Sequence, residues 1–215
     1  MTNNKEKIEQ FYRKRARHYD ISANLYYLLG FREFAYRALA IRALNAQRGD
    51  TIVEIGCGTC LNFRLLREEV GSEGKIIGVD LTPEMLAEAR NRVSRNNWSN
   101  IELVQDDAGT YQFPDRIDGV ISTFAITLVP EYDLIIKRGA SALISGGRFV
   151  VLDFKKPANW PMWLIKFFVF ITRSFGVSLD LAERHPWESV NRYLTVVQYE
   201  ELYFGGLYLC AGEAL

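Results

Sequence analysis

The segment from Val53 to Cys60, Val-Glu-Ile-Gly-Cys-Gly-Thr-Cys, places a carboxylate and two glycines at the end of a β-branched run. Glycines directly after a strand allow a tight turn and a close approach of the backbone to a ligand. Ligands of open α/β sheets bind at the carboxyl ends of strands. A dinucleotide fingerprint needs a third glycine, but Leu61 stands at that position. The turn therefore predicts a nucleotide-like ligand that lacks a diphosphate.

Three carboxylates could complete such a site. Asp80 stands at the end of the second predicted strand, where a carboxylate accepts hydrogen bonds from both ribose hydroxyls. Asp107 lies just past the third strand, where it could accept from an adenine amino group. Glu54 ends an apolar strand, and its burial would be costly without a donor or a cation beside it. Alone, a glycine pair is only a turn and an aspartate only a helix cap, whereas together they favour a ligand site.

Strand-like and helix-like segments alternate through the chain. Strands are predicted by short apolar runs at 51–55, 75–79, 101–104, 119–122 and 148–152, the last after a Gly146-Gly147 turn. Helical spacing is present at 8–19, 25–29, 33–45, 61–70 and 132–143, and Thr82 is expected to cap a helix that begins at Pro83. Because parallel strands need crossover connections, we expect an α/β fold with a mostly parallel sheet. Gly205-Gly206 predicts a two-residue hairpin turn.

The order and spacing of these motifs resemble those of the class I S-adenosylmethionine-dependent methyltransferases. The matches are Glu54-x-Gly56-x-Gly58, Gly78-Val-Asp80 with Thr82-Pro-Glu-Met-Leu86, Asp107-Ala108, and Gly146-Gly147. The resemblance covers about residues 50–154. It implies a Rossmann-like methyltransferase fold: a mostly parallel seven-stranded sheet with an antiparallel last strand, a helical N-terminal extension, and an aromatic helical insertion before the C-terminal hairpin.

The resemblance also implies a cofactor, S-adenosylmethionine, and roles for the matched residues. Glu54 would orient the methionine amino group, the two glycines would admit the methionine moiety, and Asp80 would hold the ribose. Leu81 would pack on the adenine, whose edge Asp107 and Ala108 would read. The full set of implied cofactor-binding residues is Tyr19, Glu54, Gly56, Cys57, Gly58, Asp80, Leu81, Met85, Asp107, Ala108 and Ser122. Neither a catalytic residue nor a metal site is assigned.

Two segments outside the motifs bear on the acceptor. Tyr19-Asp20 resembles an element that precedes the fold proper in ubiquinone/menaquinone C-methyltransferases and bacterial phosphatidylethanolamine N-methyltransferases. This resemblance implies a lipophilic acceptor, either a quinone-type ring or a phospholipid headgroup amine. Residues 159–171 are dense in aromatic side chains, which favours a lipophilic site and a packed cap helix about equally. A soluble phenol or amine is the alternative acceptor.

Charge and composition limit the function classes. The 215 residues have a formal net charge of zero, which argues against a dedicated nucleic-acid binder. Residues 1–50 carry ten basic and five acidic side chains, and this excess, with the aromatic insertion, is compatible with docking on an anionic membrane. A solvated helix face is the other explanation. The first 20 residues are too polar for a secretory signal, so we expect a cytoplasmic protein, with peripheral membrane association as a further hypothesis.

The length predicts a single domain over residues 1–215, divided into N-terminal helices (1–48), a cofactor-binding core (50–154) and a substrate-side insertion with the closing hairpin (155–215). Two other functions on this fold stay open, an NAD-dependent oxidoreductase and a catalytically silent cofactor-binding protein. Cys57 and Cys60 also match a C-x-x-C redox or zinc pattern. We favour small-residue packing for them, because both cysteines fall inside the ligand turn. The sequence indicates no oligomeric state.

Overall fold

The computed structural model describes residues 31–157, 160–172, 181 and 183–215. The helices expected at 8–19 and 25–29, and with them Tyr19 and Asp20, lie outside the described residues. The first described helix is α3 (Glu33–Leu44), which agrees with the spacing at 33–45.

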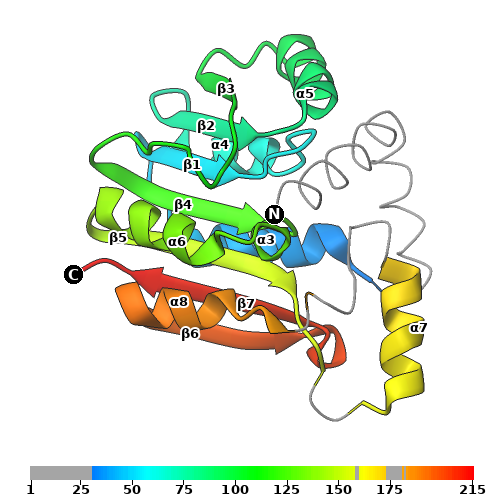
Figure 1. The fold of residues 1–215 in the computed structure, drawn as a ribbon. Coiled ribbons are helices and arrows are strands. Elements are labelled where there is room, and N and C mark those ends of the chain that lie inside the picture. Colours follow the sequence, from blue (N-terminus) through cyan, green and yellow to red (C-terminus); the bar gives the residue numbers. More distant parts are fainter. Residues whose placement is uncertain (1–30, 158–159, 173–180, 182) are drawn as a thin grey trace.

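Seven strands within the described residues form one sheet, in the order β3-β2-β1-β4-β5-β7-β6 (Figure 1). Their bounds are β1 (Thr51–Ile55), β2 (Lys75–Asp80), β3 (Ile101–Gln105), β4 (Ile117–Thr123), β5 (Leu143–Phe154), β6 (Thr195–Leu202) and β7 (Leu207–Glu213). The strands from β3 to β5 pair in parallel, whereas β7 is antiparallel to both β5 and β6. This arrangement confirms the Rossmann-like sheet with an antiparallel end.

Helices cover both faces of the sheet because the central strands are apolar on both sides. Ile52 and Ile76 pack in a cluster with side chains of α3, α4 (Phe63–Val70) and α5 (Pro83–Arg95). Their chain neighbours Val53 and Ile77 pack in a second cluster with side chains of α6 (Tyr132–Ala142) and α8 (Pro186–Tyr193). Because side chains alternate along a strand, consecutive apolar residues fill two cores, which gives a three-layer α/β sandwich.

Two local expectations were wrong in detail. Gly146 and Gly147 lie inside β5 rather than in a turn before it, because their backbone groups pair with Ala214 and keep the segment in the ladder. The β6–β7 connection is a short 3-10 turn over Tyr203–Gly205 rather than a two-residue glycine turn. Tyr203 and Phe204 adopt left-handed φ values of 47° and 56°, so aromatic residues make most of the reversal.

Between β5 and β6, the described residues include the helices α7 (Met162–Thr172) and α8. In Figure 1, α7 lies apart from the sheet, at the end of the molecule toward which β4 and β5 point. Across the described part of the chain, no helix is long and apolar enough to span a bilayer. α7 thus confirms the expected aromatic helical insertion, whereas the sequence analysis did not predict α8.

The connectivity creates a crevice at one edge of the sheet. From β1 the chain moves outward through β2 to β3, and it then returns to place β4 on the other side of β1. The carboxyl ends of β1 and β4 therefore meet at a point where the strand order reverses. Such switch points are where ligands bind in open α/β sheets.

Candidate active site

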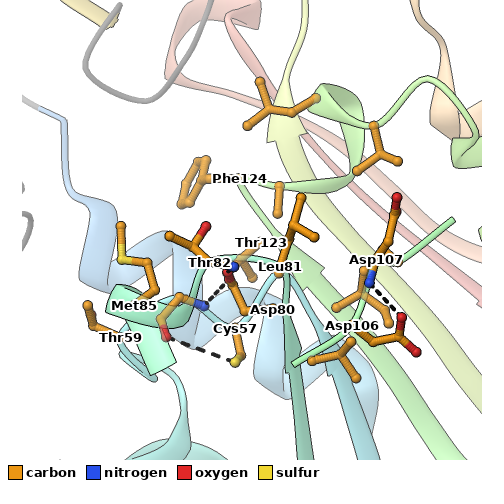
Figure 2. A pocket seen from close by; sticks show the side chains of 18 of the residues that line it. Cys57, Thr59, Asp80, Leu81, Thr82, Met85, Asp106, Asp107, Thr123 and Phe124 are labelled. Carbon is orange, nitrogen blue, oxygen red and sulfur yellow. Dashed lines mark hydrogen bonds between the residues drawn. The ribbon is translucent and has the colours of Figure 1, made fainter. Parts of the chain in front are cut away.

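A pocket lies at this edge, and residues that follow β1, β2, β3 and β4 line it (Figure 2). Eight residues of the set expected from the sequence are among its lining: Gly56, Cys57, Gly58, Asp80, Leu81, Met85, Asp107 and Ala108. Arg37, Thr59, Asp106, Thr123 and Phe124 line it too and were missed. The pocket therefore brings together segments that are up to about 90 residues apart in the chain.

The two glycines of the turn after β1 differ in how much space surrounds them. The backbone N–H of Gly56 donates to the carbonyl of Val79 at 2.8 Å, and the residue has a φ of +70°. A Cβ at Gly56 would lie only 2.3 Å from Cβ of Ala125. A Cβ at Gly58, by contrast, would meet no atom within 4 Å. Gly56 thus permits the close packing of the turn, and Gly58 leaves open space beside the pocket.

Asp80 connects the end of β2 to the glycine turn. Its Oδ2 accepts the backbone N–H of Gly58 at 2.8 Å, and its Oδ1 accepts that of Thr82 at 2.8 Å. Burial raises the pKa of this carboxyl, and the two N–H donors partly offset that increase. Thr82 precedes α5 at the N-cap position but makes no side-chain cap hydrogen bond, so the expected capping role of Thr82 was wrong. Asp80 therefore orders the turn in addition to any role toward a ribose.

We expect Asp80→Ala to weaken binding of S-adenosylhomocysteine by at least about tenfold, because hydrogen bonds to a charged acceptor are worth ~1.5–3 kcal/mol each. The midpoint of thermal unfolding should also fall, since two backbone donors lose their acceptor. Titration calorimetry and thermal unfolding measure the two effects. The exposed Asp115→Ala is the matched control. Normal affinity in Asp80→Ala would limit Asp80 to bracing the turn.

Past β3, the two aspartates of the next segment form a short turn. Asp106 accepts the backbone N–H of Asp107 at 2.7 Å, and Asp107 accepts that of Gly109 at 2.9 Å. These contacts fix both carboxylates on one side of the pocket in Figure 2, across from Met85 and Thr59. Two carboxylates therefore bound the pocket on that side.

Glu54 lies behind the glycine turn rather than in the lining, and it is only 1% exposed. Its Oε1 accepts Nδ2 of Asn62 at 2.7 Å, while Oε2 has no hydrogen-bond partner in the described structure. Burial raises the pKa of Glu54 to about 8, against the opposing effects of the Arg37 charge and the Asn62 hydrogen bond. A buried carboxylate with an orphaned oxygen is suited to a cationic ligand group.

The remaining expected residues take other positions. The Ser122 hydroxyl donates to the carbonyl of Ile55 at 3.0 Å and joins β4 to β1, away from the lining. Cys57 and Cys60 are buried free thiols, and the interaction with the Cys60 thiol, together with burial, raises the pKa of the Cys57 thiol. Tyr19 lies outside the described residues. The structure thus places Ser122 in a backbone-bracing role and Cys57 in the pocket wall.

One wall of the pocket is apolar. It consists of Phe124, Ala125, Leu128, Val129 and Pro130, which follow β4. Asp153 on β5 anchors this segment, because its carboxylate accepts the backbone N–H of Thr127 at 3.0 Å. Burial raises the pKa of Asp153 to about 6. Phe124 has a left-handed φ of +57°, and this strained backbone turns its ring toward the pocket (Figure 2).

The fold and this pocket define a class I S-adenosylmethionine-dependent methyltransferase. The sequence pattern of the ubiE/COQ5 methyltransferase family matches residues 1–178, and the chain belongs to that family. Two features of the site fit the cofactor: the open space beside Gly58 and the orphaned, buried oxygen of Glu54.

Individual relatives agree with this assignment. The chain is 26% identical over 181 residues to a demethylmenaquinone methyltransferase of Listeria monocytogenes, covering 82% of this chain and 75% of the relative. It is 28% identical over 187 residues to one of Geobacillus kaustophilus, covering 85% and 79%. The fold is similar to that of a geranyl diphosphate C-methyltransferase from Streptomyces coelicolor, with a TM-score of 0.67 at 14% identity, covering 85% and 79%.

Proposed function

We propose that this methyltransferase transfers a methyl group to a lipophilic acceptor with a quinone-type ring, taken from a membrane surface. The observation that carries the proposal is the apolar wall after β4, from Phe124 to Pro130, which adjoins the cofactor-binding turn. Apolar walls with few polar groups bind hydrophobic ligands and exclude water. The demethylmenaquinone methyltransferases among the relatives support a ring acceptor over a phospholipid headgroup amine.

Alignment and exclusion of water are the main contributions that such a site makes. When bound, S-adenosylmethionine would supply the methyl group from its sulfonium by in-line displacement, S-adenosylhomocysteine would be the leaving group, and the proton of the methylated ring position would pass to solvent. The residues of the glycine turn and Asp80 hold the cofactor side of the pocket in one geometry. The Phe124 ring and the Asp153-anchored segment form the adjoining apolar wall, which would orient an aromatic acceptor ring.

Labelled S-adenosylmethionine, incubated with the purified protein and three separate acceptor pools, tests this proposal. The pools are a lipid extract that contains demethylated quinones, phosphatidylethanolamine vesicles, and a mixture of soluble phenols and amines. We expect label in an aromatic product that partitions into organic solvent. Label in phosphatidylethanolamine or in water-soluble products alone would contradict the quinone-type acceptor and assign the corresponding alternative.

An exposed face of α7 supports presentation of the acceptor from a membrane. The exposed fractions of Met162, Trp163, Phe167 and Phe170 are 54%, 70%, 54% and 57%. Trp163, Phe167 and Phe170 are spaced by four and three residues, so they lie on one side of the helix, which we call the α7 aromatic face. Residues 155–179 carry four basic and no acidic side chains, although Lys155 pairs with Glu201. Aromatic rings with flanking basic residues are typical of interfacial helices.

We expect the protein to float with anionic vesicles at low salt and to be released as salt rises, because the attraction is screened over a Debye length of ~8–10 Å. Trp163→Ser with Phe167→Ser should remove the part of binding that persists at high salt. Leu134→Ser, which changes an exposed apolar residue on α6, is the control. If the folded wild type does not bind anionic vesicles at any salt concentration, the membrane part of the proposal is wrong.

A further inference from the structure

The apolar wall after β4 contains a single 3-10 turn, η3 (Ile126–Leu128), whose middle residue is Thr127. A helix this short cannot satisfy all of its own backbone groups. The N–H of Leu128 donates to the carbonyl of Ala125 at 3.0 Å, which is a bond within the turn. Both backbone groups of Thr127 are instead bound by charged side chains from other parts of the chain.

Asp153 and Arg184 are these charged residues, and we call the pair the Thr127 clamp. Oδ2 of Asp153, near the end of β5, accepts the N–H of Thr127 at 3.0 Å, and Oδ1 accepts that of Phe154 at 2.8 Å. Nη1 of Arg184, which precedes α8, donates to the carbonyl of Thr127 at 2.7 Å. Hydrogen bonds to ionised groups are roughly twice as strong as neutral ones. An anion and a cation therefore fix the backbone of one residue in the wall.

The Thr127 clamp acts on the wall from behind. Leu128 and Val129, which follow Thr127, line the pocket, whereas neither member of the clamp does so among the described residues. The start of the wall is anchored separately, because the N–H of Phe124 donates to the carbonyl of Leu152 at 2.8 Å. The clamp therefore fixes the part of the wall that lies beyond Phe124.

Arg184 is not needed to attach α8 to the rest of the molecule. Asp133 of α6 does this, because it accepts the Ser189 hydroxyl at 2.6 Å and Nη1 of Arg192 at 2.8 Å. Arg184 instead joins the wall to the chain that leads from α7 to α8. The contact therefore links the substrate-side insertion to the pocket.

We propose that Asp153 and Arg184 are positioning residues for the methyl acceptor, because they fix the wall relative to the cofactor side of the pocket. The inference deepens the proposed function and rests on it, since the wall is the part of the site assigned to the acceptor. Neither residue contacts the reacting atoms. Displacement of the wall misaligns the acceptor, and a misplacement of about 1 Å is enough to slow a transfer reaction. The cofactor, held at the turn after β1 and at Asp80, does not depend on the clamp.

Steady-state kinetics with two varied substrates tests the role of Arg184. The acceptor probe is a naphthoquinol that carries one prenyl unit and lacks the ring methyl group. In Arg184→Ala, kcat/KM for this probe should fall about tenfold, while KM for S-adenosylmethionine stays within about threefold of wild type. Arg184→Lys keeps a cationic donor and should restore most of the loss. Arg192→Ala, which removes an exposed arginine that contacts α6 rather than the wall, should leave kcat/KM unchanged.

Asp153→Asn tests the other member of the clamp. Both carboxylate oxygens accept an N–H, so an amide must turn its own donor toward one of the two. This variant should also lose kcat/KM for the probe. Because both residues hold Thr127, the loss in Asp153→Asn combined with Arg184→Ala should be smaller than the product of the single losses. Purely multiplicative losses would contradict a shared action on the wall.

Hydrogen exchange follows the wall without any acceptor. In folded Arg184→Ala, the backbone amides of residues 126–130 should exchange faster than in the wild type, and those of β1 should not change. Wild-type exchange in this segment, or faster exchange with unchanged kcat/KM for the probe, would overturn the proposal. If the wild type does not methylate the naphthoquinol but exchange in Arg184→Ala is faster, the quinone-type acceptor is wrong and the hold of the clamp on the wall is confirmed.

Discussion

Glu54→Gln is expected to bind S-adenosylhomocysteine about 10- to 100-fold more weakly than the wild type at pH 8, and to do so with little dependence on pH. In the wild type, the affinity should rise as the pH increases from 6 to 8. The reason is the position of Glu54, which is buried behind the glycine turn and has a pKa of about 8. Only the ionised carboxylate pairs with an ammonium group.

The affinity rises with pH because binding of the ligand must release a proton from Glu54. Below pH 8 the ligand-free Glu54 is mostly protonated, so binding of the ammonium requires the loss of that proton. The affinity then rises toward a limit of about tenfold per pH unit and levels off above pH 8. The charges around this group are Arg37 from α3, which favours ionisation, and Asp80 from β2, which opposes it.

Calorimetry in buffers of different ionisation enthalpy measures both the affinity and the proton release. Asp50→Asn is a suitable control, because its carboxylate lies away from the pocket and accepts the backbone N–H of Gln47. A wild-type affinity that is flat between pH 6 and 8, without proton release, would contradict the role given to Glu54.

The same pKa predicts how the ligand-free protein responds to pH. Between the ordinary value of 4.5 and about 8, the native state keeps a proton on Glu54 that the unfolded chain has lost. The free energy of unfolding should therefore fall as the pH rises through this window, by at most ~1.4 kcal/mol per pH unit from this group. Asp153, whose pKa is about 6, adds to the slope at the lower end. In Glu54→Gln, chemical denaturation should show a flatter dependence between pH 6 and 8.

Most of the sheet and of the cofactor side could be predicted because their signals are local. Apolar runs predicted β1 to β4 within one or two residues at each end. The signal is strongest for β1, β2 and β4, because strands buried on both faces are apolar along most of their length. The glycine turn and Asp80 are tied to strand ends, and parallel strands bring those ends to one edge. Sequence order and strand geometry were sufficient to place them together.

The buried hydrogen bonds that join Arg37, Asn62, Thr123 and Glu54 could not be predicted, because they form between distant elements. The sequence does not separate Arg37 from Arg42, the exposed arginine of the same helix, whereas in the structure Arg37 is buried and donates a hydrogen bond to Thr123. Alternation along β4 was the one signal available, since Ser122 and Thr123 must point to opposite faces. Ser122 points to Ile55 of β1, which leaves Thr123 for the side of α3 and the pocket.

Gly56→Val is expected to abolish measurable binding of S-adenosylhomocysteine. A Cβ at this position would lie 2.3 Å from Cβ of Ala125, well inside van der Waals contact, and Ala125 itself lines the pocket. Relief of the clash must move either the glycine turn or the wall that follows β4, and each of them shapes the pocket. The φ of +70° adds backbone strain of ~1–2 kcal/mol for a residue with a side chain, more for a β-branched one.

The control for Gly56→Val separates loss of the pocket from loss of stability. Gly146 has a similar φ of +81°, but a Cβ there would meet nothing within 4 Å. It pairs with Ala214 in the first half of β5, at the opposite end of the strand from Asp153. Gly146→Val should therefore lower the unfolding midpoint through strain alone and still bind S-adenosylhomocysteine normally. Circular dichroism confirms folding of both variants, and calorimetry measures binding. If folded Gly56→Val bound the ligand as tightly as Gly146→Val, the cofactor would not occupy the turn after β1.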